Sequence, residues 1–545
     1  MLVLGLVGTG LVVGVLGGPT GSSVAAAATC APAFTNPTST AAVADMPFSF
    51  PVTTCGVATS GSAITVSPLP DGLAYHTNGD GTGVISGTPQ PESVGADTVT
   101  LRAFVEGDLV TQQTLALSVV ITALPSGASV SPPASVASDC STDVTTALNA
   151  WLASVPSGST IVLPVHGCYL VSNSATTLML DGRTGLTFVG NGTTFEQTSY
   201  ACGSNELQPV LTLTGNTNLT FDNLTVDGPG TCGGAFSEGD YGILLGQSTP
   251  GNTDITFNVV TVNNTDGDGL AIYPELGTCC GINTNIRFQN GAMSNIGYHT
   301  ITPEGVNGLA ILNNRFVNDG NFMDMEVDND GPGNGATPVG VAQWNITVKG
   351  NTFTQGAALN IDSLQGACVP QRNVTIAQNT LTASSQGLSI LLGGSGAAAS
   401  SCPRDSGLTI VNNSSLGPAG SPCGGSIASP PGCSMIEIAD YSNVRIQGNT
   451  FTANDGEQGY FENTIWVPCI TLQGVAGASI VDNACTNAYD VWDSVNWQFQ
   501  STDYVDSGIS ACGNTFGLST LLPLVLGGVA AQVTPESDAA CAVLG

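Results

Sequence analysis

The chain has 545 residues, enough for two domains and a large hydrophobic core. It contains 70 glycines and only 9% charged residues, a composition typical of a globular protein rich in strands and turns. Eight Lys and Arg against 40 Asp and Glu give a formal charge of −32. That charge argues against nucleic acid, disfavours acidic polysaccharides unless metal ions bridge the charges, and favours neutral glycans or cations as partners.

Residues 1–29 resemble a signal peptide. An apolar stretch is followed by an Ala-rich segment at 24–28, where a cleavage site would lie. The usual basic segment does not precede the apolar stretch, so we expect the natural start to lie upstream. Near the C-terminus, LLPLVLGGVAA is too short to span a bilayer. We therefore expect a secreted, extracellular monomer with no membrane span.

The sixteen cysteines include no CxxC pair and no Cys/His cluster with zinc spacing, so they indicate disulfides in an exported protein. Adjacent Cys279 and Cys280 would be strained if bonded to each other, and we expect each to have a separate partner. Pairs close in sequence are the predicted partners: Cys30–Cys55, Cys140–Cys168, Cys202–Cys232, Cys368–Cys402 and Cys423–Cys433.

Residues 30–123 are predicted to form one small all-β unit. Short alternating stretches such as ITVS, DTVTLRAFVEG and QQTLALSVVIT are separated by turns of Gly, Pro, Asn and Asp. The string LPDGL…GVISGTP resembles the Ig-like modules of bacterial exported proteins, which implies a β-sandwich. Residues 124–138, LPSGASVSPPASVAS, are predicted to be a Pro/Ser linker.

The third region, 139–545, starts with a predicted helix. Helical spacing over 143–152 places Ala147, Leu148, Trp151 and Leu152 on one face. The order of short helix, IVLP, Gly and Tyr resembles the capping helix and first coil of pectate-lyase-like right-handed parallel β-helices. That resemblance implies an all-β solenoid after the Ig-like sandwich.

A repeated phrase supports this fold. GLTFVGN, NLTFDNLTV, NITVKGNTF and NVRIQGNTF are variants of one sequence that recurs at intervals of 23 to 37 residues. Ten unequal repeats predict the coils of a parallel β-helix. The recurring Asn suits a tight turn whose side-chain amides would hydrogen-bond from coil to coil. The fourth residues of the ten phrases are Phe188, Phe221, Phe257, Phe288, Ile311, Val348, Ile376, Ile410, Ile446 and Ile480.

A further strand is predicted 13 to 15 residues after each of these anchors. Apolar residues there would face inward, and because side chains alternate along a strand, their neighbours would face outward. On this count Glu326 and Asp362 are neighbours on the outer face, with Asp324, Asp328 and Glu304 within reach. The predicted inner column is Ile272, Ile301, Met325, Ile361 and Ile390.

Crowded carboxylates raise one another's pKa, which supplies a general acid beside an ionised base or nucleophile. Glycoside hydrolysis uses such a pair, about 5–5.5 Å apart for retention or roughly 6.5–9.5 Å for inversion, and the backbone spacing permits either. The simpler alternative is a solvated acidic face on an acidic protein. The candidate catalytic residues are Asp324, Glu326 and Asp362, with Asp268 and Glu304 in support.

The stretch NNTDGDGLAIYPE (263–275) resembles the Asn-Thr-Asp-Gly strand of polygalacturonase-like hydrolases. That resemblance implies an active-site position for Asp266, with Asp268 beside it. His299 has the inward parity of Ile301, so an interior or turn histidine competes with a catalytic base. The candidate substrate-binding residues are Tyr273, Thr302, Asn360, His299 and Asp266.

EVDNDG (326–331) approximates the opening of a calcium loop, which makes Asp328 and Asp330 candidate calcium ligands. The expected enzyme needs no cofactor, and calcium is the alternative.

The sequence favours a glycoside hydrolase that cleaves a neutral or weakly charged polysaccharide. A calcium-dependent polysaccharide lyase or epimerase is a second hypothesis, and a non-catalytic glycan-binding adhesin is a third. Lyases of this architecture often need Lys or Arg, whereas the outward columns assigned here contain none. The nearby basic residues all fall within the repeated phrase: Arg287, Arg315, Lys349, Arg372 and Arg445.

Overall fold

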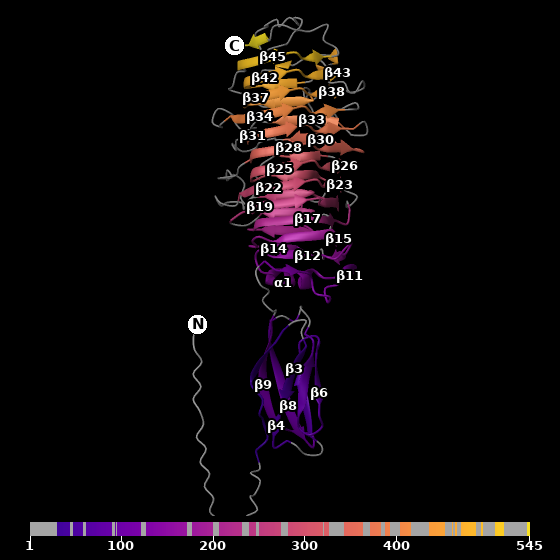
Figure 1. Ribbon diagram of the computed structural model, residues 1–545, viewed down its shortest axis with the longest axis vertical. Helices are drawn as coiled ribbons and strands as arrows, with labels where there is room; N and C mark the ends of the chain where they lie inside the picture. Colours follow the sequence, from indigo (N-terminus) through magenta and orange to yellow (C-terminus); the bar gives the residue numbers. More distant parts are fainter. Residues whose placement is uncertain are drawn as a thin grey trace, which may run out of the picture. The chain divides into compact units, whose positions relative to one another are not determined.

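A computed structural model shows two compact units, Met1–Val120 and Ile121–Gly545 (Figure 1). Among the described residues, no helix is both long and apolar enough to cross a bilayer. The residues described are 30–43, 47–57, 62–89, 93, 95–120, 127–171, 177–199, 207–230, 239–246, 250–273, 282–319, 321–325, 343–362, 371–382, 387–392, 404–415, 435–452, 460–461, 464–465, 470–486, 492–493, 507–516 and 542–544.

The first unit contains two sheets that share one hydrophobic core. Phe50 and Ile85 of the three-stranded sheet pack in one cluster with Leu101 and Leu115 of the four-stranded sheet. The predicted Cys30–Cys55 disulfide is confirmed, while an Ig-like identity stays a prediction. The four-stranded sheet holds β2 (Ser39–Val43), β9 (Asp108–Val120), β8 (Gly95–Val105) and β5 (Ser62–Ser67); the three-stranded sheet holds β3 (Phe48–Val52), β7 (Gly83–Gly87) and β6 (Leu73–Thr77); β1 (Ala33–Phe34) pairs with β4 (Thr54–Cys55).

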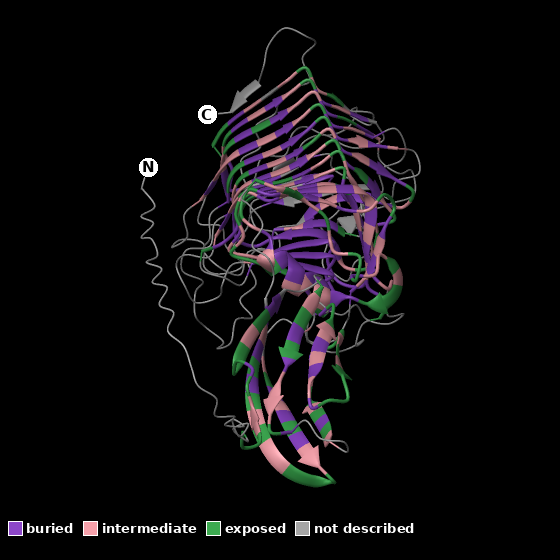
Figure 2. Cartoon of the chain, turned by 60° about the horizontal axis from the view of Figure 1, so that its bottom comes forward, coloured by how far each residue is buried: buried purple, intermediate pink, exposed green. Residues whose placement is uncertain are grey.

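The second unit is a right-handed parallel β-helix, as predicted. Its coils are built from a 25-stranded sheet and an 11-stranded sheet, and Figure 2 shows the stacked coils. The strands of the 11-stranded sheet are β14 (Leu178–Asp181), β16 (Leu211–Thr214), β18 (Ile243–Gly246), β21 (Leu270–Tyr273), β24 (His299–Pro303), β27 (Asn321–Asp324), β30 (Ala358–Asp362), β33 (Gly387–Leu392), β36 (Ile436–Ala439), β41 (Ile470–Gln473) and β44 (Trp492–Asp493).

The 25-stranded sheet contributes one or two strands to each coil, and a separate pair, β39 (Tyr460–Phe461) and β40 (Thr464–Ile465), lies outside it. Its strands are β10 (Ser129–Val130), β11 (Asp139–Asp143), β12 (Thr160–Val162), β13 (Cys168–Leu170), β15 (Thr187–Glu196), β17 (Thr217–Asp227), β19 (Thr253–Asn258), β20 (Thr261–Thr265), β22 (Asn283–Gln289), β23 (Ala292–Ile296), β25 (Val306–Leu312), β26 (Arg315–Val317), β28 (Gln343–Lys349), β29 (Thr352–Thr354), β31 (Gln371–Ala377), β32 (Thr380–Leu381), β34 (Asp405–Val411), β35 (Ser414–Ser415), β37 (Tyr441–Gln447), β38 (Thr450–Thr452), β42 (Ala476–Val481), β43 (Ala484–Thr486), β45 (Ser507–Cys512), β46 (Thr515–Phe516) and β47 (Ala542–Leu544).

The N-terminal end of the β-helix is closed by α1 (Thr145–Ser154), close to the predicted helix. Leu148, Trp151 and Leu152 are buried against the first coils. The sheet itself begins inside the segment predicted as a linker, because β10 pairs with β12. The Cys140–Cys168 disulfide, which joins β11 to β13, is confirmed. Cys485 and Cys512 are also disulfide-bonded, and the other predicted pairs lie outside the described residues.

The ten anchor residues of the repeated phrase form one continuous inner column, as predicted. Each is the backbone partner of the next across neighbouring strands. The first four are phenylalanines, and the rings of the first three stack at centroid distances of 4.7 Å and 5.2 Å. The repeat therefore fixes both the coil and its register.

A buried ladder of asparagines runs along one bend of the coils. In each step a side-chain amide donates to the carbonyl oxygen of the next Asn side chain, at 2.9 to 3.1 Å. This confirms the expected amide bonds between coils. The ladder consists of Asn314, Asn351, Asn379, Asn413, Asn449, Asn483 and Asn514.

The register of the 11-stranded sheet corrects one prediction. Ile301 pairs with Met323, not with Met325, and Ile272 pairs with Pro303. Ile272 and Met325 were therefore placed two residues out of register, because alternation fixes only which face a residue occupies and a shift of two preserves it. The observed inner column is Leu178, Leu211, Ile243, Leu270, Ile301, Met323, Ile361, Ile390, Ile436 and Ile470.

Candidate functional site

The corrected register brings two of the predicted acids together on adjacent strands. Asp324 closes β27, and its backbone partner is Asp362, which closes β30. Neighbouring strands of a sheet lie about 4.8 Å apart, so these two residues are direct neighbours. Glu326 was expected beside Asp362, but that place belongs to Asp324. Glu326 itself lies outside the described residues.

His299 lies between two carboxylates from the coils before and after its own. Its Nδ1 is 3.6 Å from Asp268 Oδ1, and its Nε2 is 3.6 Å from Asp324 Oδ2. The backbone N–H of His299 also donates to Asp268 Oδ1 at 3.2 Å. His299 is buried, as its inward parity suggested, but all five positions of β24 are buried, so exposure does not distinguish inner from outer residues there.

Two tyrosines fix Asp268 from the other side. The Tyr273 hydroxyl donates to Asp268 Oδ2 at 3.4 Å, and the Tyr241 hydroxyl donates to Tyr273 Oη at 3.2 Å. Burial raises the pKa of Tyr273 well above its usual range, and the charges of Asp268 and Glu304 raise it further. Tyr273 therefore stays protonated and keeps its hydrogen as a donor to the carboxylate.

The acids of this cluster are not freely solvated, unlike those of an ordinary acidic surface. Asp266, Asp268 and Glu304 are 2%, 1% and 7% exposed. The side chain of Asp324 is 16% exposed, which makes it the more accessible of the two carboxylates that face His299. Burying carboxylates costs free energy unless partners compensate them. The cost of this arrangement favours a functional origin over a solvated acidic face.

Thr302 and Asn360 have different surroundings. Thr302 lies beside Ala271 in the register, is 3% exposed, and among the described residues its hydroxyl has no hydrogen-bond partner. A buried hydroxyl without a partner is costly, and no described group offsets that cost at Thr302. Asn360 instead donates its side-chain amide to Asn321 Oδ1 at 3.0 Å.

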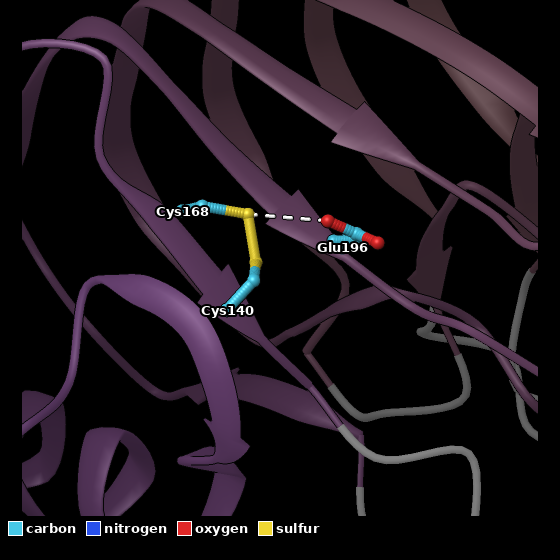
Figure 3. A group of neighbouring side chains, drawn as sticks. All are labelled: Cys140, Cys168 and Glu196. Carbon is cyan, nitrogen blue, oxygen red and sulfur yellow. Dashed lines mark hydrogen bonds between the residues drawn. A yellow bond between two sulfur atoms is a disulfide. The ribbon is translucent and has the colours of Figure 1, made fainter.

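The predicted calcium ligands Asp328 and Asp330 lie outside the described residues. Within the described part of the chain, one group of potential metal ligands is Cys140, Cys168 and Glu196, with Glu196 Oε2 3.2 Å from Cys168 Sγ. Figure 3 shows that both sulfurs are joined in the disulfide. A metal needs thiolates, so the oxidised pair does not form a metal site.

Two residues near the cluster were not predicted. Ile243 pairs with Leu270, so Tyr241 has the same position before β18 that Asp268 has before β21 in the next coil. Asp319 is 1% exposed just before β27, and burial raises its pKa to about 8. The signal for Asp319 was the Asp-Gly at 319–320, which repeats the Asp-Gly at 266–267 in the same position before a strand.

No family model and no curated protein matches the chain. Three solved structures are similar to it. Endo-xylogalacturonan hydrolase from Aspergillus tubingensis is 13% identical with a TM-score of 0.38, over 73% of this chain and 93% of that one. The A-module of a mannuronan C-5 epimerase from Azotobacter vinelandii is 15% identical with a TM-score of 0.35, over 72% and 97%. DFA-IIIase from Arthrobacter chlorophenolicus A6 is 13% identical with a TM-score of 0.38, over 72% and 94%. At TM-scores below 0.5 these likenesses carry no weight for the activity.

Proposed function

We propose that the protein is a secreted carbohydrate-active enzyme, a glycoside hydrolase that cleaves a neutral or weakly charged polysaccharide. The observation that carries the proposal is the pairing of Asp324 with Asp362 on adjacent strands beside His299. Its substrate would lie against the outer side of the 11-stranded sheet. The disulfides Cys30–Cys55 and Cys140–Cys168 support an exported protein.

The two carboxyl groups have different roles in this proposal. Asp324 is the ionised partner, because His299 in its cationic form would stabilise a carboxylate facing it. Asp362 would then hold the proton and act as the general acid, since carboxylic acids on directly paired residues do not both ionise readily. Glu326 remains a candidate for either role.

Bond cleavage follows from these roles. Asp362 would give its proton to the glycosidic oxygen while the bond from that oxygen to the anomeric carbon breaks. Asp324 would either accept a proton from the water that attacks the anomeric carbon, or attack that carbon itself and be released later by water. The Cα spacing of about 4.8 Å allows carboxyl separations suited to either route.

Asp268 and the tyrosines would position His299 in this proposal. Asp268 lies on the Nδ1 side of the imidazole, which leaves Nε2 directed at Asp324. Tyr273 and the backbone of His299 both donate to Asp268, so its carboxylate is fixed before substrate binds. Such preorganisation lowers the cost of reaching the reactive geometry. Glu304, which is buried near Tyr273, adds to the negative field there.

The test is a panel of neutral and weakly charged polysaccharides assayed for new reducing ends. Wild-type protein should release reducing ends from at least one glycan, and Asp324→Asn and Asp362→Asn should each lower the rate by about 100-fold or more. Asp254→Asn is the matched control, because Asp254 is exposed and tolerates Asn at its positive φ of 57°. Full activity in both site variants would overturn the proposal.

The product separates this proposal from its alternatives. A product that absorbs in the ultraviolet through a new double bond, formed only when calcium is present, would identify a lyase. Binding of a glycan without any cleavage, unchanged in Asp324→Asn and Asp362→Asn, would identify an adhesin.

A further inference from the structure

Half of the chain's eight basic residues lie on the outer side of one group of strands. Arg287 belongs to β22, Lys349 to β28, Arg372 to β31 and Arg445 to β37, and all four are exposed. These four residues are called the cationic strip below. They belong to the 25-stranded sheet, whereas the candidate catalytic acids close strands of the 11-stranded sheet.

The register shows that the strip runs along the axis of the β-helix. Arg287 and Arg445 occupy the same column, five coils apart, which is about 24 Å at 4.8 Å per coil. Lys349 and Arg372 lie on the coils in between, in the columns on either side. The column between Arg287 and Arg445 is filled by Ala310, Thr347, Thr375 and Thr409.

The local charge of this surface is opposite to that of the whole chain. At the outward positions described for β22, β25, β28, β31, β34 and β37 there is no carboxylate. Asp405, the acid on β34, is 7% exposed, and burial raises its pKa to about 8, so it is largely uncharged at neutral pH. Among the described residues, the outward positions of these six strands therefore carry cations and no exposed acid, although the protein has a formal charge of −32.

The other side chains on this surface suit a sugar chain. The guanidinium of Arg372 lies over the Trp344 ring, 5.2 Å from its centroid, and Trp344 is half-buried with an open part. An aromatic ring held in this way provides a flat apolar surface. Thr347, Thr375 and Thr409 are partly exposed and place hydroxyls between the cations. Hydroxyls and an aromatic ring are groups that recognise a sugar.

We propose that the cationic strip binds a chain of an acidic polysaccharide laid along the β-helix axis. Carboxylates of the glycan would pair with the four cations, and its hydroxyls would meet the threonine column. This binding does not depend on the proposed catalytic site. Nucleic acid is the competing polyanion, and the threonine hydroxyls and the Trp344 ring on this surface favour a sugar chain over it.

The experiment is affinity electrophoresis in gels that contain polygalacturonate, with EDTA present so that calcium cannot bridge the charges. Wild-type protein should be retarded relative to a dextran gel, and added salt should reduce the retardation. Lys349→Gln and Arg445→Gln should each weaken binding by up to about fivefold. Arg102→Gln is the matched control, since it removes one exposed positive charge from the first unit. It should bind like wild type.

Three results would overturn the proposal. Equal retardation of Lys349→Gln, Arg102→Gln and wild type would show that the strip takes no part. Binding of an oligothymidylate as tight as that of polygalacturonate would show a general polyanion surface. Concentration-dependent sedimentation that is lost in Lys349→Gln would show that the strip contacts a second copy of the chain. The assay requires no cleavage, so it is also carried out on Asp324→Asn. Its result stays interpretable if the proposed hydrolase activity is absent.

Discussion

His299 Nε2 lies 3.6 Å from Asp324 Oδ2, across the neighbouring strands β24 and β27. The other ring nitrogen lies 3.6 Å from Asp268, so one imidazole lies between two carboxylates, from the coils before and after its own. The chain has three histidines. His299 has this placement between two carboxylates, whereas His76 belongs to the first unit. It makes His299 the group that orients Asp324 in the proposed reaction.

His299→Gln should therefore lower kcat by up to about 100-fold while KM changes little, because the substrate still binds but Asp324 loses the side chain that orients it. Steady-state kinetics on the best glycan of the panel measure both constants. His76→Gln is the control, since His76 is exposed on β6. An unchanged kcat would remove His299 from the mechanism.

Tyr273→Phe removes the hydroxyl that donates to Asp268. We expect kcat to fall several-fold and the free energy of unfolding to fall by about 1 kcal/mol, the usual contribution of one hydrogen bond. The effect should be constant between pH 5 and pH 9, because burial raises the pKa of Tyr273 well above that range.

Tyr241→Phe is the comparison for this prediction. It removes the hydroxyl that donates to Tyr273 and leaves the bond from Tyr273 to Asp268 in place. Its kcat should stay near that of wild type. Identical kinetics for the two tyrosine variants would mean that the hydrogen bond to Asp268 has no part in catalysis.

The fold was predictable because the sequence repeats it. The anchor phrase recurs in ten successive coils with an inward residue at the same place, so Phe188 through Ile480 could be aligned without knowing the loops between them. The 11-stranded sheet has no such phrase. Its strands follow a bend of variable length, and alternation alone cannot distinguish Met323 from Met325. That ambiguity is why Asp362 was assigned the wrong neighbour.

The burial and charge of the surfaces were less predictable. Glu304 was expected on an outer face, and it is nearly inaccessible, as is Asp268. Net charge also conceals how charges are distributed, because it sums the buried acid Asp405 with exposed Arg372 and Arg445. The cationic strip appears only when the register places residues from distant repeats on one surface.

Asn379→Ala tests the buried asparagine ladder. Asn379 donates to Asn413 Oδ1 and to the backbone oxygen of Val348, and it accepts from Asn351. Removing its amide leaves several buried groups without partners, so we expect a loss of about 3–5 kcal/mol in the free energy of unfolding, measured in guanidinium. Asn307→Ala is the control, because Asn307 is partly exposed and accepts one bond from Asn345. Equal losses would show that the ladder adds nothing beyond an ordinary surface amide.

Asp319 should make stability depend on pH in a direction opposite to that of most carboxylates. Burial raises its folded-state pKa to about 8, from an ordinary value of 3.8. The folded protein therefore keeps the proton that the unfolded chain releases above about pH 4. The stability contributed by the neutral acid is fully present below pH 4 and is lost as the pH rises towards 8, at up to about 1.4 kcal/mol per pH unit.

Asp319→Asn replaces the acid with a group of similar shape that does not ionise. The difference in free energy of unfolding between variant and wild type should be constant below pH 4 and should then shift in favour of the variant up to about pH 8. Guanidinium unfolding at pH 4, 6 and 8 measures this difference, with Asp254→Asn as the exposed control. Because both proteins retain Asp405, whose pKa is also raised to about 8, its contribution cancels in the comparison. A difference that stays the same at all three pH values would mean that Asp319 is ionised in the folded protein.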